Sequence, residues 1–253
     1  MEKEQYYLGL VSVSFRQHTP KEILEAAAAA GLSHIEWGSD VHAPSGDPAG
    51  LSEIAELQKR YGIACSSYGT YFRLGETPIE ELEQYIAAAK ILNTRVLRLW
   101  CGAKRGADMT DGERAELLSL CRQAAAMAEV HRVLLCMECH RGTFTEEPSD
   151  AVWLMEAVAS PHFRMYWQPF QWQSTQQNLA NAELIAPYAE HIHVFHWKGQ
   201  EKLPLSAAVE EWQDYLRNFS TPRTLLLEFM PRGTLEELRG EADALKMIVG
   251  EPK

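Results

Sequence analysis

Acidic residues stand at the ends of two strongly apolar runs in this 253-residue chain. Glu138 follows Leu-Leu-Cys-Met, and Glu228 lies between three leucines and a phenylalanine. A carboxylate in a segment with the composition of buried core needs a partner. Two carboxylates ~4–5 Å from each other repel by roughly 4 kcal/mol at an effective dielectric constant near 20. They therefore require a shared proton, a paired cation or a metal ion.

A histidine is expected at the same place. His196 lies in a third apolar run, and one imidazole with two carboxylates makes a donor set for a divalent ion. His191 and His193 stand at odd spacing from His196 and are expected to face the surrounding helices. A metal ion held by Glu138, His196 and Glu228 is the simpler interpretation.

Plain ion pairs are the alternative interpretation of these carboxylates. Glu138 would pair with Arg98 and Glu228 with Lys198, and the pairs would close the top of a barrel without a metal. The residue types alone leave both interpretations open.

Eight short apolar runs position these residues, and a longer amphipathic segment follows each one. Several runs are continuously apolar, which is typical of parallel strands covered on both faces. The runs are Tyr7–Ser14, Ser33–Trp37, Ile63–Tyr68, Arg95–Trp100, Val133–His140, Arg164–Gln168, His191–Trp197 and Thr224–Phe229. Four T-x-x-E capping boxes, which begin at Thr19, Thr77, Thr110 and Thr234, predict helix starts between them.

Eight strand–helix units in 253 residues average about 32 residues each, which predicts a single (β/α)8 TIM barrel domain over residues 1–253. A doubly wound open sheet is disfavoured because Leu10–His18, after the first strand, contains no glycine for a phosphate-binding turn. In such barrels the chemistry lies at the carboxyl ends of the strands. Glu138 and Glu228 are therefore expected to meet at the barrel mouth.

The composition excludes several classes of partner. The 35 acidic residues outnumber the 24 basic ones, and no Lys/Arg-rich run could grip a nucleic-acid backbone. No apolar stretch approaches membrane-spanning length. Five cysteines without framework spacing and an N-terminus without a secretory pattern predict a cytoplasmic protein.

Three motifs resemble the xylose-isomerase-like TIM barrel superfamily of sugar phosphate isomerases and epimerases, which also contains inosose dehydratase and endonuclease IV. Residues 138–143 are similar to its E-x-H-x-G-T, Val-Phe-His-Trp-Lys to its strand-seven v-H-l-K, and Leu-Leu-Leu-Glu-Phe to its last metal-binding glutamate. The resemblance implies one divalent ion, Mn, Mg, Zn or Co. Its ligands would be Glu138, Gln168, His196 and Glu228.

The strand-six motif departs from that family. The D-x-x-H pattern is here Gln168-Pro-Phe-Gln171, so an amide replaces a carboxylate ligand. An amide oxygen binds a hard cation more weakly than a carboxylate does. We therefore predict metal binding of reduced affinity.

The resemblance implies proton transfer beside the carbonyl of a small sugar or polyol, with or without a phosphate, through an enediolate. Glu138 and Glu228 would act as base and acid. The expected substrate-contacting residues are Glu36, His42, Tyr68, Arg98, Trp100, His140, Gln171 and Lys198. We predict no nucleic-acid or membrane partner, and a homodimer is a further expectation.

Other functions remain open at this stage. An inosose-dehydratase-like lyase would remove the same proton and expel a neighbouring hydroxyl. A non-catalytic sugar-binding protein would follow if the strand-six amides abolished metal binding. A Schiff-base aldolase using Lys198 and a nuclease are disfavoured, since Lys198 lacks an apolar surrounding and the chain lacks a basic face.

Overall fold

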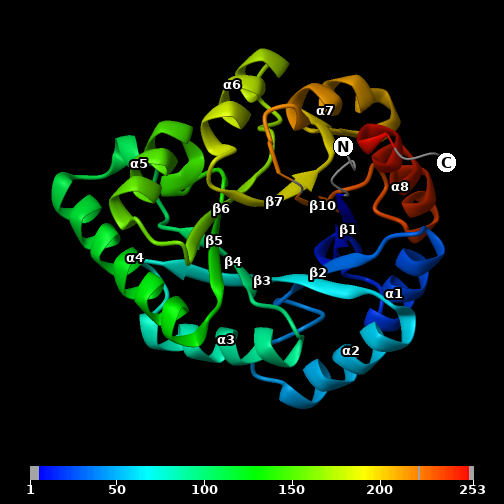
Figure 1. The fold of residues 1–253 in the computed structure, drawn as a ribbon, viewed down its shortest axis with the longest axis horizontal. Helices are drawn as coiled ribbons and strands as arrows, with labels where there is room; N and C mark the ends of the chain where they lie inside the picture. Colours follow the sequence, from blue (N-terminus) through cyan, green and yellow to red (C-terminus); the bar gives the residue numbers. More distant parts are fainter. Residues whose placement is uncertain (1–5, 222, 251–253) are drawn as a thin grey trace.

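The computed structural model describes residues 6–221 and 223–250. Within them, eight parallel strands close into a barrel in the order β1-β10-β7-β6-β5-β4-β3-β2, and eight α-helices surround it (Figure 1). The predicted (β/α)8 TIM barrel is therefore confirmed.

Strands and helices alternate along the chain. The barrel strands are β1 (Tyr7–Val11), β2 (His34–Gly38), β3 (Ala64–Leu74), β4 (Val96–Cys101), β5 (Leu134–Glu138), β6 (Phe163–Trp167), β7 (Ala189–Val194) and β10 (Thr224–Leu227). The helices are α1 (Pro20–Ala29), α2 (Pro48–Tyr61), α3 (Leu82–Ile91), α4 (Asp111–His131), α5 (Pro148–Val158), α6 (Thr175–Ile185), α7 (Val209–Leu216) and α8 (Leu235–Val249).

Local capping explains where several helices begin. The predicted capping boxes are present at Thr19, Thr110 and Thr234. Such a box satisfies two backbone amides that the helix itself cannot pair. The box predicted at Thr77 is wrong, because its hydroxyl accepts a hydrogen bond from the Arg73 amide and a short 3-10 turn precedes α3.

The strand predicted over His191–Trp197 ends earlier than expected. β7 stops at Val194, and the chain then forms a separate antiparallel hairpin of β8 (His196–Lys198) and β9 (Glu201–Leu203). His196 therefore lies outside the barrel wall.

The barrel interior changes from apolar to polar towards its mouth. Residues two apart on a strand face the same side, so an interior residue is followed by another two positions later. Four strands each contribute one residue to a small interior cluster, and the residue two positions later, nearer the mouth, is charged or an amide. The pairs are Val96 and Arg98, Cys136 and Glu138, Tyr166 and Gln168, and Leu226 and Glu228.

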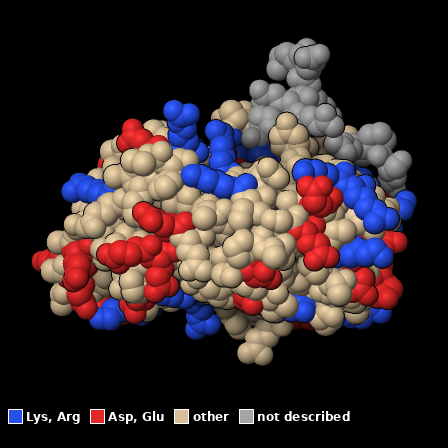
Figure 2. Space-filling model, turned by 90° about the horizontal axis from the view of Figure 1, so that it is seen from below, with Lys and Arg blue, Asp and Glu red and all other residues tan. Residues whose placement is uncertain are grey.

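The surface carries both signs of charge. On the face drawn in Figure 2, basic side chains are separated by uncharged and acidic ones. Among the helices that the structure describes, none has the length and apolar character to cross a membrane. A single domain over 1–253, a cytoplasmic location, the absence of a nucleic-acid partner and a homodimer stay predictions.

Candidate active site

A cavity of about 300 Å³ opens at the carboxyl ends of the strands. Its polar lining comes from Arg16, Arg98, Glu138, His140, Arg141, Gln168, Gln171 and Glu228. Its aromatic lining comes from Tyr71, Trp100, Phe170, Phe195, Trp197 and Phe229. Apolar walls with a few converging polar groups are typical of a small-molecule site.

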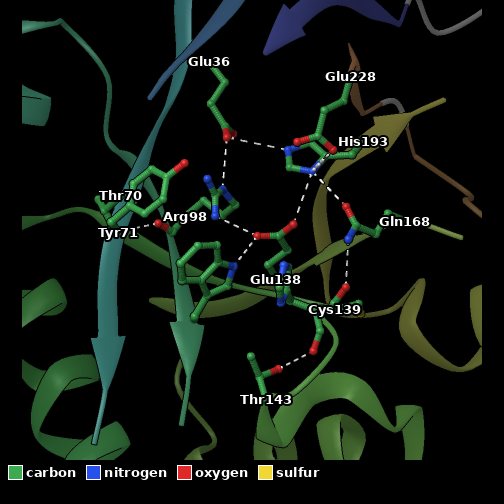
Figure 3. A network of polar contacts seen from close by, with 12 residues as sticks. Glu36, Thr70, Tyr71, Arg98, Glu138, Cys139, Thr143, Gln168, His193 and Glu228 are labelled. Atoms are coloured by element: carbon green, nitrogen blue, oxygen red, sulfur yellow. Dashed lines mark hydrogen bonds and ion pairs between the residues drawn. The ribbon is translucent and has the colours of Figure 1, made fainter. Parts of the chain in front are cut away.

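Glu138 ends β5 at the floor of this cavity and is 4 % exposed. Its Oε2 accepts hydrogen bonds from Arg98 Nη1 at 2.7 Å and from Trp100 Nε1 at 2.6 Å (Figure 3). Burial by itself raises the pKa of this carboxyl, but the charges of Arg98 and His193 outweigh burial and lower the pKa. Glu138 is therefore ionised at neutral pH.

Glu228 follows β10 and is 7 % exposed. Burial, aided by the charge of Glu138 and opposed by His193, raises the pKa of this carboxyl to about 7. The next residue, Phe229, has a left-handed φ of 54°, and its amide donates to Ser14 Oγ at 3.0 Å. A bulky residue in this region is strained, and such strain is typical of functional sites.

His193 lies between these carboxyls, and the prediction that it faces the helices is wrong. Its Nδ1 lies 3.3 Å from Glu228 Oε2, 3.8 Å from Glu138 Oε1 and 3.0 Å from Gln168 Oε1. His191 also points inward, with Nε2 3.2 Å from the Ser66 carbonyl oxygen. His191 and His193 share the inner face because residues two apart on a strand face the same side, and β7 ends at Val194, so His196 does not continue this alternation.

His196 is not part of this group, so its prediction as a metal ligand is wrong. Its Nδ1 lies 3.1 Å from the Pro204 carbonyl oxygen, across the β8–β9 hairpin. The ring borders a separate, nearly filled space beside Lys198 and Glu211. His193 takes the place that was expected for His196.

The donors around His193 Nδ1 are suited to a divalent ion. An ion with ligands at ~2.1 Å in tetrahedral or octahedral geometry separates neighbouring donors by about 3.0–3.4 Å. The three contacts of Nδ1, at 3.0 to 3.8 Å, bracket that spacing. Among the described residues, however, no group of three His, Cys, Asp or Glu side chains is already arranged as a metal site. One imidazole, two carboxylates and one amide oxygen nevertheless fit such an ion by their chemistry.

The opposite ring nitrogen supports this fit. His193 Nε2 is buried and has no hydrogen-bond partner among the described residues. It lies 3.6 Å from Glu36 Oε1. The charges of Glu228 and Glu36 overcome burial and raise the pKa of His193 to about 9, so a metal ion would have to displace a proton from Nδ1. A carboxylate on the far side of a metal-binding imidazole fixes which nitrogen faces the metal.

Glu36 lies beneath the cavity and is fully buried, so its prediction as a substrate-contacting residue is wrong. Its Oε1 accepts from Arg98 Nε at 3.1 Å and its Oε2 from Ser67 Oγ at 2.8 Å. Burial raises the pKa of this carboxyl, but Arg98 and His193 outweigh burial and hold it far below the ordinary value. Arg98 thus links Glu36 and Glu138 as a buried cation between two carboxylates (Figure 3).

Three other predicted contact residues also lie away from the cavity. His42 places its ring nitrogens near Ser12 Oγ and the His18 carbonyl oxygen. Tyr68 is fully buried and donates to the Ala43 carbonyl oxygen, and exposed Lys198 pairs with Glu211 at 2.7 Å. The alternative pairing of Lys198 with Glu228 is therefore absent, whereas Arg98 does pair with Glu138.

The structure brings the remaining predicted residues to the cavity. They are Arg98, Trp100, His140 and Gln171 in the lining, with Glu138, Gln168 and Glu228. His140 stacks against Trp100 with ring centroids 5.0 Å apart. His193 was missed, because the alternation of side chains along β7 does not by itself show which set faces the interior.

The family model for the xylose isomerase-like TIM barrel matches residues 24–217. The chain belongs to the xylose isomerase-like TIM barrel family. A curated relative, 3-dehydroshikimate dehydratase from Bacillus anthracis, is 24 % identical over 119 residues. That match covers 47 % of this chain and 42 % of the relative, so less than half of the relative's length is spanned.

Solved structures share the fold over nearly the whole chain. The probable 3-DHS dehydratase AsbF from Bacillus anthracis has a TM-score of 0.81 at 18 % identity, covering 96 % of this chain and 99 % of its own. The IOLI protein with a bound zinc atom has a TM-score of 0.76 at 14 % identity, covering 96 % and 98 %. D-allulose 3-epimerase from Methylomonas sp., in complex with D-allulose, has a TM-score of 0.72 at 12 % identity, covering 96 % of each. At these identities the likeness shows the fold alone.

Proposed function

We propose that this protein is a metal-assisted enzyme that removes a proton beside the carbonyl group of a small polyhydroxylated compound and then expels water from it. The observation that carries this proposal is the pair of carboxyls around His193 Nδ1. Without a metal ion, the pKa of Glu138 is lowered and that of Glu228 is raised to about 7. Two carboxyls whose environments separate their pKa values are suited to act as base and acid.

Each residue of the chain has a role in this reaction. Glu138 accepts the proton from the carbon beside the carbonyl, and the neighbouring carbon–oxygen bond breaks. Glu228 donates its proton to the departing hydroxyl, which leaves as water, and proton exchange with solvent resets both carboxyls. Arg98 and Trp100 hold Glu138 by two hydrogen bonds to its Oε2, so Oε1, which faces His193 Nδ1, would serve both the ion and the substrate.

Glu138, Gln168, His193 and Glu228 are the residues that would hold a divalent ion. When bound, the ion polarises the carbonyl and stabilises negative charge on its oxygen. The aromatic walls exclude water from the base, which strengthens its interaction with the substrate. Gln168 supplies a neutral ligand, so the affinity is expected to be low.

Dehydration is favoured over epimerisation by the 119-residue stretch matched to 3-dehydroshikimate dehydratase. Isomerisation or epimerisation of a ketose is the second candidate, favoured by the likeness to an epimerase that holds D-allulose. Both reactions begin with the same proton removal. They differ in whether the proton returns to carbon or a hydroxyl leaves.

Hydrogen exchange tests the shared step. The metal-supplemented protein is incubated in deuterated water with 3-dehydroshikimate, D-allulose or D-fructose, and the products are analysed by NMR and mass spectrometry. We expect deuterium at the carbon beside the carbonyl in recovered substrate, and loss of one water in the product formed from the dehydratase substrate. An epimerised ketose without loss of water would instead support the second candidate.

Matched variants identify the proton carriers. Glu138→Gln and Glu228→Gln should each lower exchange by about 10²-fold or more, in the range for general acid–base catalysis. Glu113→Gln, a surface change on α4, should leave exchange unaltered. Absence of exchange and of product for every compound, with folded metal-loaded protein, would refute an enolising enzyme. Sugar binding that ignores a chelator would then favour a non-catalytic binding protein.

A further inference from the structure

A second cavity of about 320 Å³ lies beside the first, outside the base and acid already described. Arg141, Phe170 and Gln171 line both cavities, so the two spaces share a wall. The far side of the second cavity is formed by Trp172 and the Glu146–Glu147 segment. The volume of each cavity is near the lower limit for small-molecule sites, and together the two cavities have room for two ring-sized groups.

The loop that carries the shared wall is held in place by a buried amide. Asn178 on α6 is 2 % exposed. Its Oδ1 accepts from the Phe170 amide at 2.8 Å, and its Nδ2 donates to the Phe170 carbonyl oxygen at 3.1 Å. These two bonds fix the backbone that leads to Gln171 and Trp172.

Trp172 is held against the β8–β9 hairpin while much of its ring remains exposed. The Gly199 amide donates to the Gln171 carbonyl oxygen at 2.7 Å. A Cβ atom added at Gly199 would lie 3.4 Å from Trp172 Cζ3, so the indole lies against bare backbone. Trp172 is nevertheless 55 % exposed. A positioned but uncovered indole offers a flat surface to a ligand.

Three polar groups around this indole have no hydrogen-bond partner within the described part of the chain, whereas Glu146 accepts from the Gly142 amide and Gln173 from Asn181 Nδ2. The side chains of Arg141 and Gln171 make no hydrogen bond there, and neither does the Glu147 carboxylate. They provide donors and acceptors beside an aromatic face. This combination matches a ring with an apolar face and a rim of hydroxyl groups, as in a sugar.

We propose that the second cavity is a subsite for a second sugar-like ring, linked to the ring that reacts in the first cavity. The proposal rests on the proposed function, because it assumes that the first cavity holds the reacting unit. Trp172 would stack on the second ring, and Arg141 and Gln171 would bind hydroxyl groups at the junction of the two rings. The preferred substrate is then a disaccharide-sized polyol, and a free monosaccharide would fill only the first cavity.

Binding without turnover provides the test. Cellobiose, maltose, sucrose, trehalose and gentiobiose are titrated by calorimetry into the full-length protein, and glucose and fructose are titrated for comparison. We expect at least one disaccharide to bind on the order of tenfold more tightly than either monosaccharide. Trp172→Ala should remove this difference, and Trp172→Phe should retain part of it.

Trp153→Ala is the matched control. Trp153 on α5 is 40 % exposed and lines neither cavity, so its loss should preserve the disaccharide preference. Equal affinity for all disaccharides and monosaccharides, or the same loss in both tryptophan variants, would overturn the subsite. A disaccharide preference in a protein that exchanges no substrate hydrogen would keep the subsite and reject the proposed reaction. Hydrogen exchange in a monosaccharide without any disaccharide preference would reject the subsite and keep the proposed reaction.

Discussion

Replacing Arg98 by methionine tests whether the buried cation holds the site together. Arg98 is 4 % exposed and contacts Glu36 at 3.1 Å and Glu138 at 2.7 Å. At an effective dielectric constant of 20, each contact is worth about 5–6 kcal/mol of attraction before desolvation. Desolvation cancels much of it, and breaking a buried pair costs ~3–5 kcal/mol. We expect Arg98→Met to lower the free energy of unfolding by that amount.

Urea denaturation of the metal-free protein measures this loss at pH 8 and pH 5. Without Arg98, burial raises the pKa values of Glu36 and Glu138, so both carboxyls become protonated at higher pH than in the parent protein. A protonated carboxyl no longer needs the cation. The destabilisation should therefore shrink as the pH falls from 8 to 5.

Arg114→Met is the control for a less buried pair. Arg114 lies 3.4 Å from Asp150, and both side chains are partly exposed, so about 1 kcal/mol or less is expected. If Arg98→Met costs no more than this control, or if its cost does not change with pH, the view of Arg98 as a buried counter-charge is refuted.

Four further changes examine other parts of the structure. His193→Ala should abolish stoichiometric binding of Zn²⁺ or Mn²⁺ in calorimetry, whereas His196→Ala should retain it; the opposite result would restore the original ligand assignment. Glu36→Gln should weaken metal binding by about 10–100-fold, because an amide cannot balance the charge at His193 Nε2. Unchanged metal affinity in the same titration would show that Glu36 does not orient His193. The raised pKa of Glu228 means that the folded metal-free protein binds a proton that the unfolded chain releases, so the free energy of unfolding falls as the pH rises from about 5 to 7. Glu228→Gln should flatten this slope in urea titrations. An unaltered slope would contradict the raised pKa of Glu228. Thr110→Ala should lower the free energy of unfolding by ~1 kcal/mol because it removes the capping box of α4, whereas Thr110→Ser should keep the box. Equal thermal stability of the two variants would argue against a stabilising cap.

The fold could be predicted because its determinants are local. Apolar runs of strand length, capping residues and a repeat of about 32 residues are visible in the order of residues. Glu138 and Glu228 could be placed at the mouth for the same reason, since each follows an apolar run that ends there. Arg98 could be predicted as a site residue because it is a charged residue within the apolar run of β4.

The contact residues were predicted less well because contact depends on depth and direction. Glu36 ends the same kind of run as Glu138, yet it lies one layer deeper, beneath Arg98. Tyr68 was expected at a strand end, but β3 continues to Leu74 and buries it. Neither the depth of Glu36 nor the burial of Tyr68 can be predicted from the neighbouring residues alone.

The sequence by itself determined the architecture of this protein, the strands that reach its mouth and two carboxylates that lie there, because hydrophobic periodicity and capping are properties of neighbouring residues. Only the tertiary structure decided that His193 and not His196 meets them. β7 ends at Val194, and His196 lies in the separate β8–β9 hairpin, outside the barrel wall. The barrel closes around the inward side chains, and that closure also sets the depth of Glu36 and the second cavity beside Trp172.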